Sequence, residues 1–318
     1  MLSRKHKLFI WKIISLFSVV RGYNIPIIAL AQYLSAIFIL APEQRALSIL
    51  LDFRLFIIVL CSSLTIASGY IINSFYDSKK DLINRPNKSQ LDRLVSQKTK
   101  LQVYFSLNFF VALIAFFLSF RAVLFYSAYI FLIWFYSHKI KRYPLIGNLM
   151  AAFLAVLPFF GILLYYYLKM PLYEIESNSG KLAVILSHGA FLFLLILIRE
   201  MIKDLENLKG DFANNYKTIP IIYGEPVSKK IITALALLTI IPVYFLINVY
   251  DVGYMDIYFY FGFIIMIFFL LYLWKWKSKE QYVLLHNVLK FLIVSGVFCI
   301  VLINPSVLWH GKKVLMTI

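Results

Sequence analysis

Charged side chains are scarce in this chain. Only 15% of its 318 residues are Asp, Glu, Lys or Arg, whereas 62% are hydrophobic. A typical soluble domain contains about 25% charged residues. A chain this apolar has too few polar groups to cover its own surface in water, so the composition excludes a soluble globular domain and predicts an integral membrane protein.

Cysteine is also nearly absent, and histidine shows no pattern. Cys61 and Cys299 both lie inside apolar runs, which excludes a disulfide framework and a thiolate metal site. The five histidines are scattered without an HExxH pair, which argues against zinc. No linker or low-complexity tract divides the chain, so residues 1–318 are expected to form a single polytopic membrane domain.

The positive charge of the chain does not indicate nucleic acid. The net charge is +17, but the basic residues fall in short loops between apolar runs. This is the distribution of the positive-inside rule, with anionic lipid headgroups as a secondary partner. The membrane is therefore the predicted partner, and no nucleic-acid partner is expected.

Apolar runs are long and frequent. A helix needs about 20 apolar residues to cross roughly 30 Å of hydrocarbon. Nine runs approach or exceed this length, at 24–41, 54–76, 101–120, 122–138, 145–168, 182–203, 228–249, 254–274 and 283–303. The expected fold is an all-α integral membrane protein with about nine transmembrane helices.

Three spans have special features. Only Arg121 separates the third span from the fourth, which predicts a tight helical hairpin. Pro158 and Gly161 are expected to kink the fifth span, where neighbouring helices can satisfy the freed backbone groups.

The N-terminal segment has the outline of a signal peptide, with Arg4 to Lys7 followed by Leu8 to Val20. Lys12 interrupts the apolar run, however, and no small-residue cleavage site follows. Residues 1–22 are therefore predicted to remain as an interfacial amphipathic helix on the cytoplasmic side.

The distribution of Lys and Arg predicts the orientation. With the N-terminus inside, 24 of the 32 Lys and Arg residues lie on the cytoplasmic side and seven on the other, and Lys290 lies within the last span. The long polar stretches 77–100 and 199–230 are then both cytoplasmic loops. The predicted location is the inner (cytoplasmic) membrane of the cell.

The first acidic cluster lies at the end of the second span. Asn73, Asp77 and Asp81 recur every four residues, and a helix with about 3.6 residues per turn places them along one face. Three oxygen-bearing side chains in a row suit a hard cation such as Mg²⁺, which prefers oxygen ligands and keeps substrate phosphates in its shell.

The second cluster lies at the end of the sixth span. Glu200, Asp204, Asn207 and Asp211 are spaced i, i+4, i+7 and i+11, which again makes one helical stripe. Gly210 is expected to let the helix unwind near Asp211.

Acidic residues at helix ends are often only solvated caps, and one cluster alone would favour that interpretation. Two clusters on the same membrane side favour function, because a carboxylate costs up to about 2.5–3.5 kcal/mol at the membrane centre and less toward the interface. A diphosphate held by Mg²⁺ between two facing rows of oxygen ligands accounts for both clusters.

The residues in and around these clusters resemble the UbiA superfamily of intramembrane prenyltransferases. The first signature is matched by Asn73-x-x-x-Asp77-x-x-x-Asp81 with Asn84-Arg85-Pro86, and the second by Arg199-Glu200-x-x-Lys203-Asp204-x-x-Asn207-x-x-Gly210-Asp211 with Thr218-Ile-Pro220 and Gly224. Weaker similarity lies in Tyr136-Ser137 with Lys141-Arg142, Pro144 and Gly147-Asn148, and in Arg21 with Asn24.

One position departs from the family pattern. The second motif usually reads Asp-x-x-Asp-x-x-x-Asp, and Asn207 replaces the middle acid here. An amide oxygen can bind Mg²⁺ or a bound water but brings no charge. Glu200, one turn back on the same stripe, is a candidate to compensate.

The resemblance implies helices bundled around a central prenyl-diphosphate cavity that opens to the cytoplasm, and Mg²⁺-dependent transfer of a prenyl group from an allylic polyprenyl diphosphate. The implied metal ligands are Asn73, Asp77, Asp81, Asp204, Asn207 and Asp211. The four aspartates, Lys141 and Arg142 are the expected catalytic residues, since the metal and the cations neutralise the leaving diphosphate. Asn24, Asn73, Arg85, Tyr136 and Lys203 are the expected substrate-binding residues.

The acceptor is left open between two classes. The Arg-Glu-x-x-Lys-Asp form of the second motif and the following Thr-Ile-Pro look most like enzymes that act on geranylgeranylglyceryl phosphate. Prenylation of an aromatic acceptor, as in quinone biosynthesis, is the alternative. The sequence predicts neither the prenyl length nor the oligomeric state.

An ion-coupled transporter is the alternative from another class. Transporters place ionisable groups near the bilayer midplane and often contain internal repeats. The acids of this chain cluster at cytoplasmic helix ends instead, which favours the enzyme.

Overall fold

The computed structural model describes residues 4–167 and 179–309, and every regular element in these ranges is a helix. Eight helices of the described part are long and apolar enough to cross a membrane. They are α4 (Phe53–Tyr76), α7 (Gln97–Leu118), α8 (Phe120–His138) with η2 (Ile140–Arg142), α9 (Ile146–Tyr167), α11 (Ser179–Glu206), α13 (Ile219–Leu238) with α14 (Ile240–Asn248), η3 (Gly253–Met255) with α15 (Asp256–Lys275), and α16 (Lys279–Cys299) with η4 (Ile300–Leu302).

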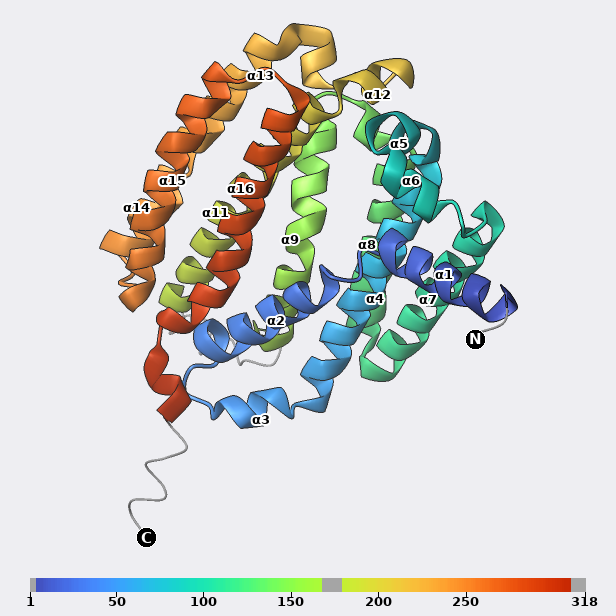
Figure 1. Cartoon of the computed structure of the whole chain (residues 1–318). Coiled ribbons are helices and arrows are strands. Elements are labelled where there is room, and N and C mark those ends of the chain that lie inside the picture. The colour runs from blue at the N-terminus through green and yellow to red at the C-terminus, as the bar shows by residue number, and fades with distance from the viewer. Residues whose placement is uncertain (1–3, 168–178, 310–318) are drawn as a thin grey trace.

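The first of the nine predicted spans is shorter than the others. It forms α2 (Ile25–Ser35) and the π-helical η1 (Ala36–Leu40), a short apolar helix that crosses the bundle obliquely (Figure 1). With this segment the structure confirms an all-α membrane protein of about nine helices. Residue 168, the predicted end of the fifth span, lies outside the described residues.

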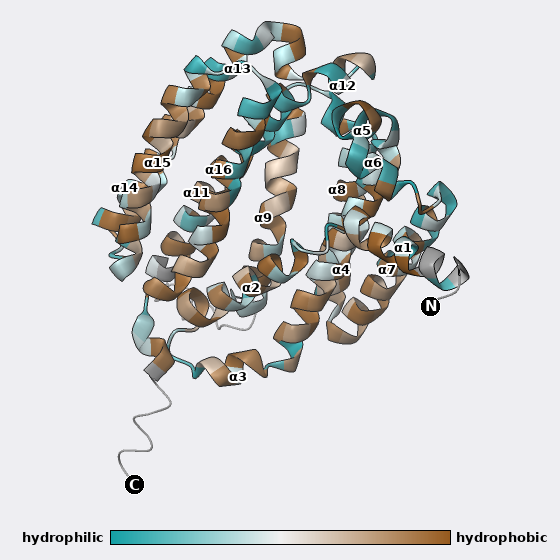
Figure 2. Cartoon of the chain, viewed as in Figure 1, coloured by the Kyte–Doolittle hydropathy of each residue, from teal (hydrophilic) through white to brown (hydrophobic). Residues whose placement is uncertain are grey.

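Lipid is the solvent for the outer surface. Phe116 and Phe117 of α7 are 69% and 80% exposed, and the long helices are predominantly hydrophobic (Figure 2). Apolar surface of this extent is stable only where it meets hydrocarbon.

The polar residues gather at one end of the bundle. This end contains α5 (Ser78–Asn84), α6 (Pro86–Asp92), α12 (Leu208–Ala213) and the start of α13 (Figures 1 and 2). The predicted loops 77–100 and 199–230 are therefore largely helical, because short helices satisfy their own backbone groups next to the membrane. The short α3 (Ala46–Leu50) and η5 (Pro305–Trp309) lie at the opposite end.

The N-terminal helix α1 (Arg4–Val19) lies on the outside of the bundle (Figure 1). Two of its serines hold it to α6: Ser15 Oγ donates to the Leu91 carbonyl at 2.7 Å, and Ser18 Oγ donates to Asp92 Oδ1 at 2.8 Å. The segment therefore packs on the polar end of the protein.

The predicted hairpin between the third and fourth spans is present. Ser119 alone separates α7 from α8, with extended backbone angles, and its side chain accepts from the Ala122 amide at 3.1 Å. The turn thus begins at Ser119, two residues before Arg121.

Pro158 lies inside the continuous helix α9. Because proline has no amide hydrogen, the Leu154 carbonyl loses its helical donor. The Tyr129 hydroxyl on α8 donates to that carbonyl at 2.9 Å, and both groups are buried. A neighbouring helix therefore satisfies the freed group, as the sequence predicted.

We expect Tyr129→Phe to lower the free energy of unfolding by about 1–3 kcal/mol, since it leaves a buried carbonyl without a partner. In a Pro158→Ala background, the restored amide can donate to Leu154 and the same change should cost less. Thermal unfolding in detergent of the wild type, the two single variants and the double variant measures the difference. An equal cost of Tyr129→Phe in both backgrounds would contradict this account.

A central cavity of about 410 Å³ lies between α2, α4, α8, α9, α11 and α16. Its lining is largely apolar, from residues such as Ile28, Ile133, Leu154 and Leu192. Polar side chains line it where these helices approach the polar end, among them Asn73, Tyr136 and Glu200. The cavity therefore joins an apolar interior to the region of the two acidic clusters.

Candidate active site

The first oxygen-bearing row follows the junction of α4 and α5. The Asp77 backbone leaves helical geometry there, but the Asp77 amide still donates to the Asn73 carbonyl at 2.9 Å and the Asp81 amide to the Asp77 carbonyl at 2.8 Å. The i, i+4 hydrogen bonds continue through the break. Asn73, Asp77 and Asp81 thus follow one another by successive helical turns, as predicted.

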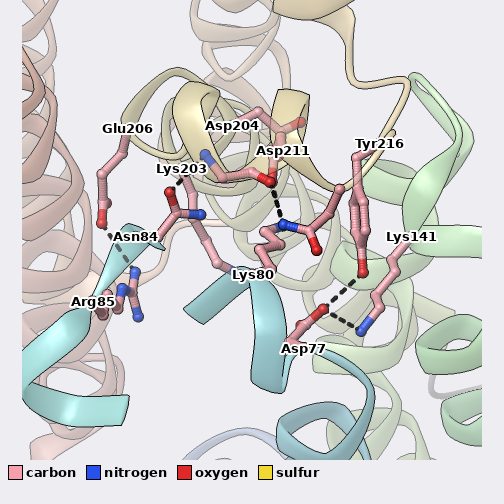
Figure 3. A network of polar contacts seen from close by, with 12 residues as sticks. Asp77, Lys80, Asn84, Arg85, Lys141, Lys203, Asp204, Glu206, Asp211 and Tyr216 are labelled. Atoms are coloured by element: carbon pink, nitrogen blue, oxygen red, sulfur yellow. Dashed lines mark hydrogen bonds and ion pairs between the residues drawn. The ribbon is translucent and has the colours of Figure 1, made fainter. Parts of the chain in front are cut away.

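Asp77 is held by two donors from other parts of the chain (Figure 3). Its Oδ1 accepts from Lys141 Nζ at 2.7 Å and from the Tyr216 hydroxyl at 2.8 Å. Lys141 also donates to Asn73 Oδ1 at 3.1 Å. Burial acts to raise the pKa of Asp77, but the charges of Lys141 and Lys80 outweigh it and hold that pKa below its usual value. Asp77 is therefore an anion with one oxygen engaged.

Asp81 is half-buried, and its carboxylate has no hydrogen bond or ion pair in the described part of the chain. Burial and the nearby charge of Asp77 raise its pKa. A cation bound next to this carboxylate would stabilise its charged form.

The second row spans the end of α11 and the start of α12. The helix breaks at Asn207, whereas Gly210 is helical inside α12, so the predicted unwinding at Gly210 is wrong. Asp204 Oδ2 accepts from Asn148 Nδ2 at 2.8 Å. Asp211 is fully buried, and its Oδ1 lies 2.5 Å from Lys80 Nζ. Burial raises the pKa of Asp211 in spite of this lysine.

Gly210 provides close approach between the two rows. Its amide donates to Asn84 Oδ1 at 3.0 Å, and a Cβ on Gly210 would lie 2.4 Å from the Asn84 amide group. Asn84 is buried, so it has little space to retreat. Only glycine allows α12 to pack this closely against α5.

A third polar group braces the same region. Glu206 Oε1 pairs with Arg85 at 3.0 Å, and its Oε2 lies 2.8 Å from His286 Nδ1 on α16. Lys279 Nζ donates to the Asn84 carbonyl at 2.6 Å. Arg85, a predicted substrate-binding residue, is therefore paired with a carboxylate next to the two rows (Figure 3).

The other predicted residues divide between the cavity wall and the surface. Asn24, Tyr136 and Lys203 line the cavity, and Asn24 Nδ2 donates to the Tyr70 hydroxyl at 3.3 Å. Arg142 is exposed, and its guanidinium lies 5.6 Å from the centre of the Tyr216 ring.

Glu200 is already engaged by its neighbours. One carboxylate oxygen lies 3.2 Å from Arg199 Nη1, and the other lies 2.7 Å from Lys203 Nζ. This arrangement gives Glu200 no free oxygen with which to replace the missing charge at position 207.

Oxygen ligands for a hard cation are present. No three carboxylate, imidazole or thiol groups within 4–167 and 179–309 lie close enough to hold an ion by themselves. Among the residues that the structure describes, the buried Asn207 Oδ1 has no hydrogen-bond partner, and the Asp211 oxygens have only the ion pair with Lys80. Mg²⁺ keeps several waters and substrate phosphates in its shell, so this donor set fits a magnesium ion that arrives with a phosphorylated substrate.

The model of the UbiA prenyltransferase family matches residues 29–295 of this chain. The chain belongs to this family. The match covers both rows, so the resemblance seen in the motifs is confirmed.

Solved structures of UbiA proteins share the fold. A structure of digeranylgeranylglyceryl phosphate synthase has a TM-score of 0.65 and 19% identity, over 92% of this chain and 98% of that one. A UbiA homologue from Archaeoglobus fulgidus bound to DMAPP and Mg²⁺ has a TM-score of 0.64 and 13% identity, over 90% and 99%.

Two relatives in sequence carry the same name. Digeranylgeranylglyceryl phosphate synthase of Thermococcus sibiricus is 33% identical over 174 residues, which is 54% of this chain and 57% of the relative. That of Methanosphaera stadtmanae is 31% identical over 201 residues, 62% of this chain and 68% of the relative. The chain thus spans under three fifths of the length of the first of these UbiA proteins.

Two residues of this UbiA site, Lys80 and Tyr216, could not be identified from the sequence. Lys80 looks like one more basic residue of a cytoplasmic segment, but it pairs with Asp211 of the other row. Tyr216 is one of 22 tyrosines, but its hydroxyl binds Asp77. Neither has a signal beyond its place within a few residues of a signature motif.

We expect Gly210→Ala to separate α12 from α5, because the added Cβ displaces the Asn84 side chain and breaks its hydrogen bond. The loss of one buried hydrogen bond costs about 1–3 kcal/mol, and activity should fall with thermal stability. Gly180→Ala is the matched control, since a Cβ there meets nothing within 4 Å. Equal melting temperatures of the two variants would contradict this role of Gly210.

Proposed function

We propose that this chain is a Mg²⁺-dependent prenyltransferase that transfers the prenyl group of an allylic polyprenyl diphosphate to an acceptor and releases diphosphate. The observation that carries the proposal is the joining of the two oxygen-bearing rows at the polar end of an apolar cavity. Lys80 pairs with Asp211 and Tyr216 binds Asp77, so each row is tied to a residue of the other segment.

Asp81, Asp204 and Asp211 are the proposed main ligands of Mg²⁺, with Asp77, Asn73 and Asn207 as further oxygen donors. Bound there, the metal neutralises the negative charge that develops on the leaving diphosphate. The fit rests on the Asn207 side-chain oxygen and on the Asp81 carboxylate, neither of which has a hydrogen-bond partner in the described ranges of the chain.

The protein's own cations complete the diphosphate site in this proposal. Lys141 is buried beside Asp77, and Arg142 follows it at the exposed edge. Both can donate charge-assisted hydrogen bonds to phosphate oxygens. Arg85 and Lys203 lie at the same end, each paired with a glutamate that can release it.

The apolar cavity suits the prenyl tail. Cleavage of the C–O bond leaves an allylic cation, which water would quench. Tyr129, Tyr136 and Phe159 line the cavity, and aromatic faces attract cations. The cavity wall therefore supports a role in both holding the chain and protecting the cation.

For the acceptor we propose geranylgeranylglyceryl phosphate, because the relatives named above are digeranylgeranylglyceryl phosphate synthases. A single domain with the active site on the cytoplasmic face is part of the proposal, and the excess of Lys and Arg at this end supports the orientation.

Purified protein should release diphosphate from geranylgeranyl diphosphate when geranylgeranylglyceryl phosphate and Mg²⁺ are both supplied. EDTA should abolish the release, and added Mg²⁺ should restore it. Turnover with an aromatic acceptor but not with geranylgeranylglyceryl phosphate would show that the proposed acceptor is wrong. Turnover in the presence of EDTA would contradict the proposed Mg²⁺ dependence.

Asp77→Asn and Asp204→Asn should each lower kcat/KM at least 100-fold, because each removes a charge from one row without changing its shape. Asp251→Asn is the control, since Asp251 is exposed just before η3 and is not among the residues that line the cavity. Unchanged turnover in both site variants would overturn the assignment of the two rows.

Asn207→Asp restores the acid of the usual family pattern and adds a charge to the second row. We expect the Mg²⁺ concentration for half-maximal activity to fall several-fold. An unchanged or higher requirement would show that position 207 does not face the metal.

A further inference from the structure

Most of the cations near the active site are paired with carboxylates. Lys80 pairs with Asp211, Lys141 with Asp77, and Arg85 with Glu206, while Arg199 and Lys203 share Glu200. Two cations that line the central cavity differ from these. Lys290 and Arg21 have no ion pair within 4.0 Å in the part of the chain that the structure describes.

Lys290 lies in the middle of α16, and its side chain is half-buried in the cavity wall. Its Nζ lies 4.8 Å from the centre of the Tyr23 ring. A lysine charge inside a membrane span is costly, by about 2.5–3.5 kcal/mol at the centre, and such residues usually serve a function. The Tyr23 ring face attracts the ammonium but does not neutralise it.

Arg21 is brought to the same cavity by the turn between α1 and α2. Its φ is +49°, a left-handed conformation that is unfavourable for a residue with a side chain. The guanidinium lies 5.0 Å from the centre of the Tyr70 ring. The turn is therefore strained at the residue that carries a cation to the cavity.

The position of Lys290 separates it from the diphosphate cluster. His286, one turn earlier on α16, lies against Glu206 at the level of the second row. Lys290 is four residues further along the helix, or about 6 Å deeper. A cation at that depth is placed for a second anion, below the one that the two rows hold.

We propose that Lys290 and Arg21 bind the phosphate group of a lipid acceptor. Two unpaired cations in a mostly apolar cavity favour a ligand that combines an apolar chain with a compact anion. A phosphomonoester at the end of an isoprenoid ether has this chemistry. The inference rests on the proposed function and adds to it a separate site for the acceptor, so that donor and acceptor anions do not compete.

Steady-state kinetics of Lys290→Met and Lys290→Arg test the assignment. Lys290→Met should raise the KM for geranylgeranylglyceryl phosphate at least tenfold and change the KM for geranylgeranyl diphosphate less than twofold. Lys290→Arg should bring the acceptor KM back to within about threefold, because it restores the charge. Lys275→Met, at the exposed end of α15 outside the cavity, should leave both unchanged.

Binding provides a readout that does not depend on turnover. The wild-type protein in nanodiscs should gain thermal stability from geranylgeranylglyceryl phosphate and much less from geranylgeranylglycerol, which lacks the phosphate. Lys290→Met should abolish the difference between the two ligands. Arg21→Asn, which tolerates the left-handed backbone, should reduce it and serves as the second variant if Lys290→Met does not fold.

Three results would overturn the inference. An equal rise of both KM values would assign Lys290 to the donor site. Equal stabilisation of the wild type and Lys290→Met by the acceptor would show that Lys290 does not bind it. Stabilisation by inorganic phosphate alone or by phosphatidylglycerol in the nanodisc, without preference for the acceptor, would assign the cations to free phosphate or to a membrane lipid. Absence of prenyl transfer in the wild type, by contrast, would count against the proposed function.

Discussion

The packing of α12 against α5 is the contact on which the site depends. Three contacts join two segments that are far apart in sequence. They are the buried ion pair of Lys80 with Asp211, the hydrogen bond from the Tyr216 hydroxyl to Asp77, and the hydrogen bond from the Gly210 amide to Asn84. Each acid row ends a different helix, so neither could concentrate enough negative charge alone. Lys80, which pairs with Asp211, and Lys141, which pairs with Asp77, offset the repulsion among the aspartates of the two rows.

The membrane imposes the rest of the arrangement. Backbone groups in hydrocarbon must be satisfied inside the protein, and this explains why Tyr129 caps the carbonyl freed by Pro158 and why the polar connections are themselves helical. The central cavity has a largely apolar lining, and polar side chains such as Asn73, Tyr136 and Glu200 line it near the acidic rows. Reactions that form a carbocation next to a diphosphate need both properties in adjacent places.

Much of the fold could be predicted from the sequence because it follows from local rules. Apolar runs predicted the spans, and the i, i+4 spacing predicted that Asn73, Asp77 and Asp81 follow one another on successive turns. The predicted position of the break in the second row was wrong. Position 210 requires glycine because α12 packs closely against Asn84 there, and the backbone of Gly210 stays helical. Lys80, Tyr216 and the Glu206–His286 contact could not be predicted, since each depends on which segments meet in space.

The central claim is that two helix ends from distant parts of the chain form one metal-dependent diphosphate site. Anomalous scattering from crystals grown with Mn²⁺ and a non-hydrolysable geranylgeranyl thiolodiphosphate tests it most directly. The account predicts a metal peak that contacts the diphosphate analogue and oxygens of both rows, Asp81 from the first and Asp204 or Asp211 from the second. A metal bound by one row alone, or a diphosphate held away from α5 and α12, would contradict it.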